Sequence, residues 1–400
     1  MENQKRRMAK INLDIIAEAT RKLRIIIGLS NIMESYKLFS LITFINSIGG
    51  CCLLIYSFYH FRHSSDDLAG VAYNFGLLNG VVVGSVSGHL GKIKLFKIVD
   101  DSYFTYDYQS SIMKKKIEEL EKPRAKALKR FFKTLLILTY AAQANLTGLT
   151  VLIGMIKKEE IYLFPCWHPF DLSNILSQIF LLAWQQFIIL GITFVAFGCW
   201  GILYITYSHI KTEISLLDFA IRNISSRARE MMQHRESVQK GEDYDKILLA
   251  CYKQCTRMCA EHHSEIIRFF TNGQDFIGIF YTTAFISGGS ACTFGGYYIS
   301  SENIELQFKY LAMTTFILTY LYILFWIAEA ISGKFFTIAQ TVYTLEWYNL
   351  PKECQSTLRL MQIRSNHPLF YKLVLGQRVD MEAYMSLVKA TYYYLNIIIT

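Results

Sequence analysis

Long uncharged stretches recur along this chain, and most charged residues lie in the segments between them. Six of these stretches reach or exceed the roughly 20 apolar residues that a helix needs to cross a bilayer core. They span residues 38–59, 68–88, 134–156, 172–208, 276–301 and 310–328. A weaker seventh segment, 381–400, contains Glu382 and Lys389 among its apolar residues. The pattern therefore predicts an all-α, multi-pass membrane protein built as a seven-transmembrane helix bundle.

The segments between the stretches also carry helical patterns. Residues 1–37 place apolar residues such as Ile11 and Ile15 among charges, which predicts an amphipathic arm with a packing face or, alternatively, a lipid-binding face. Residues 106–130 show helical charge pairing interrupted by Pro123, which predicts two separate helical extensions. Residues 225–245 are polar and predicted to be non-helical.

The distribution of basic residues predicts an inverted orientation, with the N-terminus cytoplasmic and the C-terminus extracellular. Of the 41 Lys and Arg residues, 35 fall in alternate segments beginning with residues 1–37, and only four fall in the other connecting segments. Basic loops stay in the cytoplasm because translocating them is costly. The net charge of +9 is thereby explained by membrane topology, and no nucleic acid partner is expected.

The composition and motifs argue against an enzyme or a pump. Hydrophobic residues make up 52% of the chain and charged residues 18%, against about a quarter charged in soluble proteins. We find no Walker loop, HExxH, GxSxG or kinase signature. Acidic residues are nearly absent from the predicted spans, whereas proton relays and ion-coupled carriers need intramembrane ionisable groups. We therefore expect no catalytic residues and no cofactor.

One cysteine and histidine cluster invites a zinc hypothesis. Its three thiols are spaced four residues apart, and on a helix they extend over two turns, too far to bind one tetrahedral ion. A helix-packing face is the better interpretation, so no metal site is predicted. The cluster comprises Cys251, Cys255, Cys259, His262 and His263.

Small residues in the second stretch predict close helix packing. Gly76, Gly80, Gly84 and Gly88 recur every four residues and fall on nearly one helix face. Such a face lets two backbones approach closely. Packing against a helix of the same chain is the preferred interpretation, and a subunit interface is the alternative.

Polar and aromatic residues in the outer halves of the middle spans predict a ligand pocket. An apolar cavity with a few polar groups suits a small volatile or lipid-like molecule. Ordinary packing between helices is the alternative for each single residue. The predicted lining is Tyr73, Asn74, Asn145, Leu149, Trp184, Phe187, Phe316 and Tyr320.

The seventh segment has the features of a helix that borders water. Glu382 and Lys389 lie seven residues apart on one face, which a lipid-facing helix would avoid. Leu395 and Ile399, four residues apart, share a helical face and suit an apolar gate that excludes ions by dewetting. Burial against neighbouring helices is the alternative. Two residues close to that face are placed to solvate a passing ion: Tyr392 and Asn396.

Several short sequences occur in an order found in one family. They are PCWHPFD before the fourth stretch, HHSEIIRFF leading into the fifth, then ILFWIAEAISGKF, VYTLEWYNLP and the final KATYYYLNIIIT. On these segments the chain resembles the insect odorant receptors over almost its whole length.

The resemblance implies a ligand-gated, non-selective cation channel in the plasma membrane of a sensory neuron. In this family, odorant-binding subunits assemble with a shared co-receptor as a heterotetramer. The seventh helix, residues 381–400 here, lines the pore, and Leu395 and Ile399 match the family's gate positions. Cytoplasmic helices, residues 331–380 here, anchor the tetramer. The arm then occupies residues 1–37, and six spans with their extensions occupy 38–330.

The resemblance also bears on the type of subunit. The compact connection between the fourth and fifth stretches lacks the long insertion of the co-receptor, so the chain resembles a ligand-tuning subunit that takes a small volatile odorant. A gustatory receptor-type channel remains an alternative, although the ending TYYYLNIIIT lacks that family's Gln-Phe. A receptor coupled to G proteins is a further alternative, but it would need an external amino end and an Asp-Arg-Tyr triplet.

Overall fold

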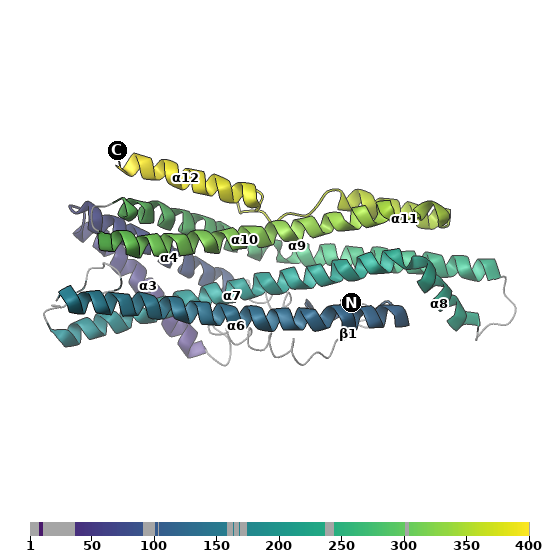
Figure 1. Ribbon diagram of the computed structural model, residues 1–400, viewed down its shortest axis with the longest axis horizontal. Coiled ribbons are helices and arrows are strands. Elements are labelled where there is room, and N and C mark those ends of the chain that lie inside the picture. The colour runs from purple at the N-terminus through teal and green to yellow at the C-terminus, as the bar shows by residue number, and fades with distance from the viewer. Residues whose placement is uncertain are drawn as a thin grey trace.

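The computed structural model describes residues 8–10, 37–90, 101–102, 104–157, 163, 168, 174–236, 244–300 and 304–399. It is a bundle of long helices that lie side by side along one main direction (Figure 1). The helices that contain the seven predicted stretches are α3 (Lys37–His60), α4 (Ser65–Leu90), α6 (Ser111–Lys157), α7 (Ile175–Arg222), α9 (Tyr244–Ile299), α10 (Ile304–Thr344) and α12 (Met381–Ile399). The described chain is therefore mostly helical, as the pattern predicted, with one small sheet in addition.

By length and hydropathy, two helical segments among the described residues qualify as membrane spans, Tyr244–Ile299 and Tyr310–Thr344. Two shorter apolar pieces are Ile48–His60 and Ile175–Gly191. The seven crossings and their orientation stay predictions. The amphipathic pattern of the arm, with Ile11 and Ile15, lies outside the described residues, as does Thr400.

The predicted close packing of the glycine face is confirmed at two positions. A Cβ atom added at Gly80 would lie 2.9 Å from the Ser287 hydroxyl, and one added at Gly76 would overlap the Ser290 side chain. Both serines belong to α9, so the partner is a helix of the same chain. The two backbones approach closely because each helix presents small residues to the other.

A small sheet joins the beginning of the chain to the segment before α6. Strand β1 (Met8–Lys10) pairs antiparallel with β2 (Phe104–Tyr106), with Met8 opposite Tyr106. The side chains of Thr105 and Tyr106 are buried. The sheet therefore joins Met8–Lys10 to a buried segment that precedes α6.

The predicted break at Pro123 is wrong, because α6 is one continuous helix with Pro123 inside it. A proline inside a helix costs about 3 kcal/mol. Pro123 is exposed, whereas the next turn buries Arg124, Ala125 and Leu128. The packing of that turn offsets the local cost.

The prediction that residues 225–245 are non-helical is wrong for its first half, which forms α8 (Ile224–Glu236). Ile224, Ala228 and Met232 recur every four residues and are all buried. Their common face packs into the helical core, which outweighs the polar character of the remaining residues.

After α10, a short 3-10 helix, η1 (Trp347–Asn349), and α11 (Lys352–Ser365) lead into an irregular segment before α12. This segment is attached to α9. The Val374 amide donates to the Thr282 hydroxyl over 2.8 Å, and a Cβ added at Gly278 would lie 2.6 Å from the Lys372 carbonyl oxygen. The contact fixes the position from which α12 starts.

Candidate functional site

Helix α12 has a well-defined beginning. The Asp380 carboxylate accepts from the Ala383 amide over 2.9 Å, and the Glu329 carboxylate of α10 accepts from the Met381 amide over 3.0 Å. Amides in the first turn of a helix lack partners within the helix, and carboxylates there also favour its dipole. Glu329, which directly follows the predicted stretch 310–328, thus ties α12 to α10.

The predicted gate residues lie in the last turns of α12. Leu395 faces α9, where a Cβ added at Gly296 would lie 2.8 Å from its side chain. Leu387, two turns earlier, packs in the same way against Gly289. Within the single chain, Leu395 therefore makes the neighbouring-helix contact that the sequence left as an alternative. Ile399 belongs to α12, but its side chain lies outside the described residues.

The part of the α12 surface that does not pack against α9 is an exposed face, which includes Tyr392 and Asn396 close to Leu395. Tyr392 is 62% exposed, and Asn396, Glu382 and Lys389 are also exposed. In Figure 1, α12 lies at the edge of the bundle rather than inside it. This face is therefore available to water or to another subunit.

Tyr73 is the predicted pocket residue with the most complete surroundings. It is fully buried, and its ring meets Tyr310 edge-on with centroids 5.2 Å apart. Tyr310 stacks in turn on Tyr298 at 4.0 Å. The hydroxyls of Tyr73 and Thr314 are buried and make no hydrogen bond to any residue that the structure describes. Both side chains lie against Gly295 of α9. The result is an aromatic cluster with two available hydroxyls.

Tyr320 lies in a second aromatic group of the same core. Its ring is 5.2 Å from that of Trp200, whose indole N–H is buried without a partner among the described residues. Trp200 lies 6.2 Å from Phe131, which stacks on Tyr204 at 3.9 Å. Trp200 was not among the residues that the sequence singled out.

The other predicted pocket residues are dispersed. Trp184 packs in a separate cluster with Leu54 and Val71. Phe316 is 59% exposed. Asn74 donates back to the Gly70 carbonyl of its own helix over 2.7 Å. The described side chains therefore do not bring all eight residues together. Phe187 is half-buried on α7, and the side chains of two residues of α6 lie outside the described set, Asn145 and Leu149.

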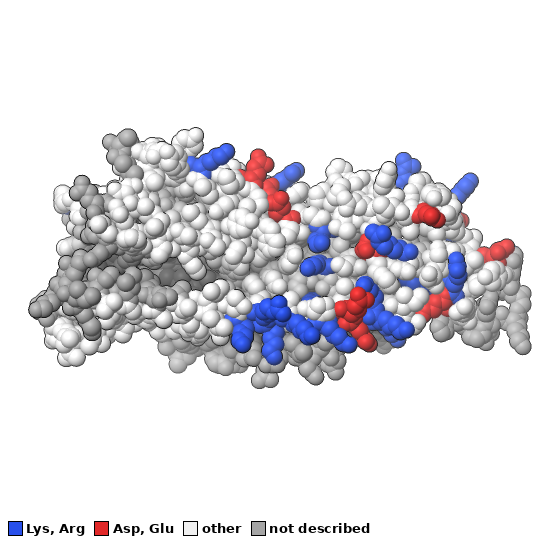
Figure 2. All heavy atoms as spheres, in the orientation of Figure 1, with Lys and Arg blue, Asp and Glu red and all other residues white. Residues whose placement is uncertain are grey.

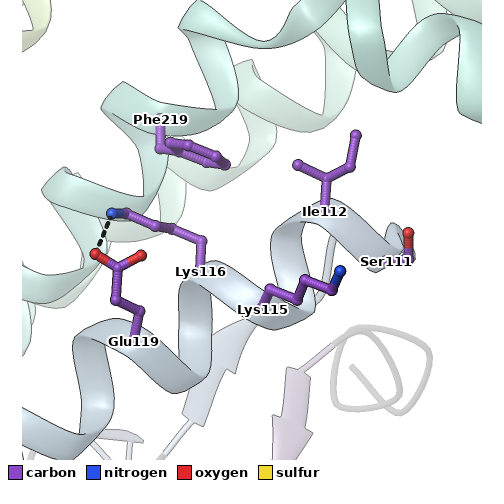
Figure 3. A pocket seen from close by; sticks show the side chains of 6 residues that line it. All are labelled: Ser111, Ile112, Lys115, Lys116, Glu119 and Phe219. Carbon is purple, nitrogen blue, oxygen red and sulfur yellow. Dashed lines mark hydrogen bonds and ion pairs between the residues drawn. The ribbon is translucent and has the colours of Figure 1, made fainter.

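A hollow of about 350 Å³ lies elsewhere, between the start of α6 and α7. Figure 3 shows Lys116 reaching towards the Phe219 ring while pairing with Glu119. The ammonium lies 5.3 Å from the ring centroid and 2.9 Å from the carboxylate. A charged, open recess of this kind does not suit a volatile apolar ligand. The remaining lining residues are Ser111, Ile112 and Lys115.

A buried network of ionisable groups, which sequence reasoning missed, joins α7, α9 and the segment before α6. The Tyr108 hydroxyl lies 2.7 Å from Nδ1 of His262, and Nε2 of His262 lies 2.8 Å from the Glu213 carboxylate. The Tyr106 ring stacks on His262 at 4.8 Å. Burial favours the neutral form of Glu213, but the hydrogen bond and charge of His262 outweigh it and lower the pKa of that carboxyl.

Two buried arginines border this network. Arg124 donates to Glu121 over 2.8 Å, where burial raises the pKa of the carboxyl despite the arginine. The Arg227 guanidinium lies 4.3 Å above the Tyr108 ring and donates to the Cys259 thiol over 3.4 Å. Arg124 is thus paired with a carboxylate, whereas Arg227 is held by the Tyr108 ring, the Cys259 thiol and the Ala220 carbonyl.

The cysteines of the proposed packing face are buried in the core, as that interpretation predicted. These buried cysteines are Cys251, Cys255 and Cys259. Burial raises the pKa of Cys255 to about 11, so this thiol is neutral and packs as a small apolar group.

Comparison with known proteins gives a consistent picture. A family model described as 7tm Odorant receptor matches residues 106–392. The fold is similar to the insect olfactory receptor OR5 from Machilis hrabei in complex with eugenol, with a TM-score of 0.80 and 12% identity over 96% of this chain and 98% of that one. A second structure of OR5 from Machilis hrabei is similar with a TM-score of 0.77 and 12% identity, over 96% of this chain and 99% of that one. No curated protein sequence matches the chain.

Proposed function

The chain belongs to the seven-transmembrane odorant receptor family, and we propose that it is the odorant-binding subunit of a ligand-gated, non-selective cation channel. It assembles with a co-receptor as a heterotetramer in the plasma membrane of a chemosensory neuron. The observation that carries this proposal is the family match from β2 to α12, and the fold shared with OR5 over 96% of the chain supports it.

The proposed orientation places seven crossings in the membrane with the amino end inside. Figure 2 supports it, because charged side chains on the visible face lie over the middle and one end of the molecule, while the described residues at the other end are nearly bare of them. The bare end contains apolar parts of the long helices. The charged end contains the beginning of α6 and the α11 region, which suits the cytoplasm.

We place the odorant beside Tyr73, between α4 and α10. The buried hydroxyls of Tyr73 and Thr314 supply the few polar groups that such a pocket needs. A small alcohol, aldehyde or ester would fit this chemistry, with its oxygen on the hydroxyls and its carbon skeleton on the tyrosine rings. Trp184, Tyr320 and the other predicted pocket residues stay candidates for a wider lining.

The proposed pore lies along the exposed face of α12. Tyr392 and Asn396 line the ion path, and the apolar end with Leu395 and Ile399 closes it. In this proposal the contact of Leu395 with Gly296 belongs to one state of the gate, and ligand binding changes it.

Co-expression with a co-receptor and whole-cell recording with a panel of volatiles test this function. We expect an odorant-evoked cation current that persists without intracellular nucleotides. Tyr73→Phe should weaken sensitivity to oxygenated odorants up to about tenfold, because a hydrogen bond contributes roughly 0.5–1.5 kcal/mol, and should spare hydrocarbons. Tyr140→Phe, at an exposed position of α6, is the control.

A current that requires GTP would contradict the channel proposal. If the current appears but Tyr73→Phe leaves every dose–response curve unchanged, the chain is a channel and the ligand position is wrong.

A further inference from the structure

Four lysines form a continuous stripe on α6 just before its apolar part. Their spacing of four, three and four residues places them within about 60° of one another around the helix. All four are exposed. We name this the α6 cationic stripe, and it consists of Lys122, Lys126, Lys129 and Lys133.

No stripe lysine forms an ion pair with the residues that the structure describes. The ion pairs of α6 within that set are Lys116 with Glu119 and Arg124 with Glu121. The acidic residues of the same helix all precede the stripe: Glu118 and Glu119 are exposed, and Glu121 is buried. Figure 2 shows the lysines and arginines of this region as a dense patch along one edge of the molecule. The stripe is thus a positive surface that the described chain does not neutralise.

The same helix face continues into an apolar surface. Leu136, Ile137 and Tyr140 follow the stripe on the same side of the helix, within about 100° of one another, and are exposed. This apolar surface faces the hydrocarbon if α6 crosses the membrane from residue 134. The stripe therefore lies directly below the acyl chains, where lipid headgroups are found.

The length of the stripe indicates which headgroups fit. Residues 122–133 span about 16 Å along the helix, whereas the headgroup region of one leaflet is only about 5–8 Å thick. Lys129 and Lys133 therefore lie at the level of ordinary phosphates. Lys122 and Lys126 lie deeper in the cytoplasm, within reach only of a headgroup that projects from the surface.

We propose that the α6 cationic stripe binds an inner-leaflet lipid whose projecting headgroup carries several phosphates, that is, a polyphosphoinositide. The proposal rests on the proposed orientation, in which this part of α6 is cytoplasmic. The lipid's acyl chains pack on the apolar surface above, and its phosphates lie along the lysines. A soluble acidic peptide would use the charges but not the adjoining apolar surface.

The test uses the purified full-length receptor in detergent micelles. Fluorescent dioctanoyl phosphatidylinositol bisphosphate is titrated by anisotropy, in parallel with dioctanoyl phosphatidylserine and with free inositol trisphosphate. The phosphatidylinositol bisphosphate should bind at least tenfold more tightly than the phosphatidylserine or the free inositol trisphosphate. Changing all four stripe lysines to Gln should weaken its binding more than a hundredfold, since each basic residue near an anionic surface contributes about fivefold.

A matched variant changes four exposed lysines elsewhere on the cytoplasmic side to Gln and should bind the lipid within about twofold of the wild type. Its positions are Lys114, Lys246, Lys352 and Lys372. An equal loss in this variant would overturn the proposal in favour of net charge. Equal binding of inositol trisphosphate would indicate a soluble phosphate ligand, and equal binding of phosphatidylserine would indicate a general anionic surface. If the quadruple variant fails to fold, Lys126→Gln and Lys129→Gln singly should each give about a fivefold loss, and no loss in either would overturn the site.

Two further measurements keep this inference separate from the proposed function. An epitope tag before Met1 that is stained on intact cells would place the stripe outside and overturn the proposal, even if odorants still bind. Conversely, a receptor that binds the lipid but gives no odorant-evoked current would refute the channel and leave the lipid site intact.

Discussion

Two buried histidines, His209 of α7 and His263 of α9, predict that the folded chain loses stability in acid. His209 contacts Phe269 with ring centroids 4.5 Å apart, and its Nδ1 has no hydrogen-bond partner among the described residues. Burial lowers the pKa of His209 to about 3, and the nearby Glu213 carboxylate offsets only part of this shift. Burial, with the charges of His262 and Arg364, lowers the pKa of His263 to about 4.

The sign of the effect follows from linkage. In the unfolded chain each imidazole takes up a proton below pH 6.5, whereas the folded chain excludes that proton until about pH 3 or 4. The neutral, buried histidines therefore stabilise the folded chain fully above pH 6.5. This contribution to the free energy of unfolding declines as the pH falls from 6.5 towards the folded-state pKa values. Between pH 7 and pH 5 each histidine costs roughly 2 kcal/mol of unfolding free energy, or about 4 kcal/mol together. The lowered pKa of Glu213 affects the free energy of unfolding only below about pH 4.5.

Thermal unfolding of the purified receptor in detergent at pH 7, 6 and 5 measures this loss. We expect His209→Gln and His263→Gln each to remove about half of the difference between pH 7 and pH 5, whatever their effect at pH 7. His367→Gln changes an exposed histidine after α11 and should leave the pH dependence as it is. A wild-type melting temperature that is flat over this range, or single variants that keep the full dependence, would refute the reasoning.

Two glycines of the helix contacts give further predictions. Gly80→Val should lower stability by about 1–3 kcal/mol, because even its Cβ would lie 2.9 Å from the Ser287 hydroxyl. The loss is measured as a lower melting temperature. Gly49→Val is the control and should leave the melting temperature unchanged, because a Cβ there meets nothing within 4 Å. Gly296→Ala should shift the odorant concentration for half-maximal current more than twofold, because its Cβ would displace Leu395, and Gly49→Ala should leave the dose–response curve unchanged.

Sequence patterns predicted the helices because the signal that they use is local. A run of about 20 apolar residues specifies a helix wherever it lies, and almost all described residues of the seven predicted stretches lie in helices. The errors at Pro123 and in residues 225–236 arise where a local signal for a break is overridden by burial. Arg124 and Ala228 are both almost completely buried, and no nearest-neighbour pattern contains that information.

The site was less predictable because its contacts join distant parts of the chain. His262 lies 154 residues from Tyr108 and 49 from Glu213, so no spacing motif could reveal the network. Of the predicted pocket residues, both Tyr73 and Phe316 were selected by their place in a span, and Tyr73 is buried. Phe316 is exposed, because the buried residues Ile317 and Leu321 fix which face of α10 points inward.

The structure places the proposed ligand site and the proposed gate on adjacent residues of one helix. Gly295 of α9 lies against Tyr73 and Thr314, and Gly296 lies against Leu395. The same arrangement occurs two turns earlier, where Gly288 contacts Leu321 of α10 and Gly289 contacts Leu387 of α12. No side chain of α9 separates its backbone from either neighbour at these four positions. A shift of α10 caused by a ligand at Thr314 must therefore move the α9 backbone or open a gap beside it. Because a close-packed interior tolerates no such gap, we expect the shift to reach α12 and change the packing of Leu395.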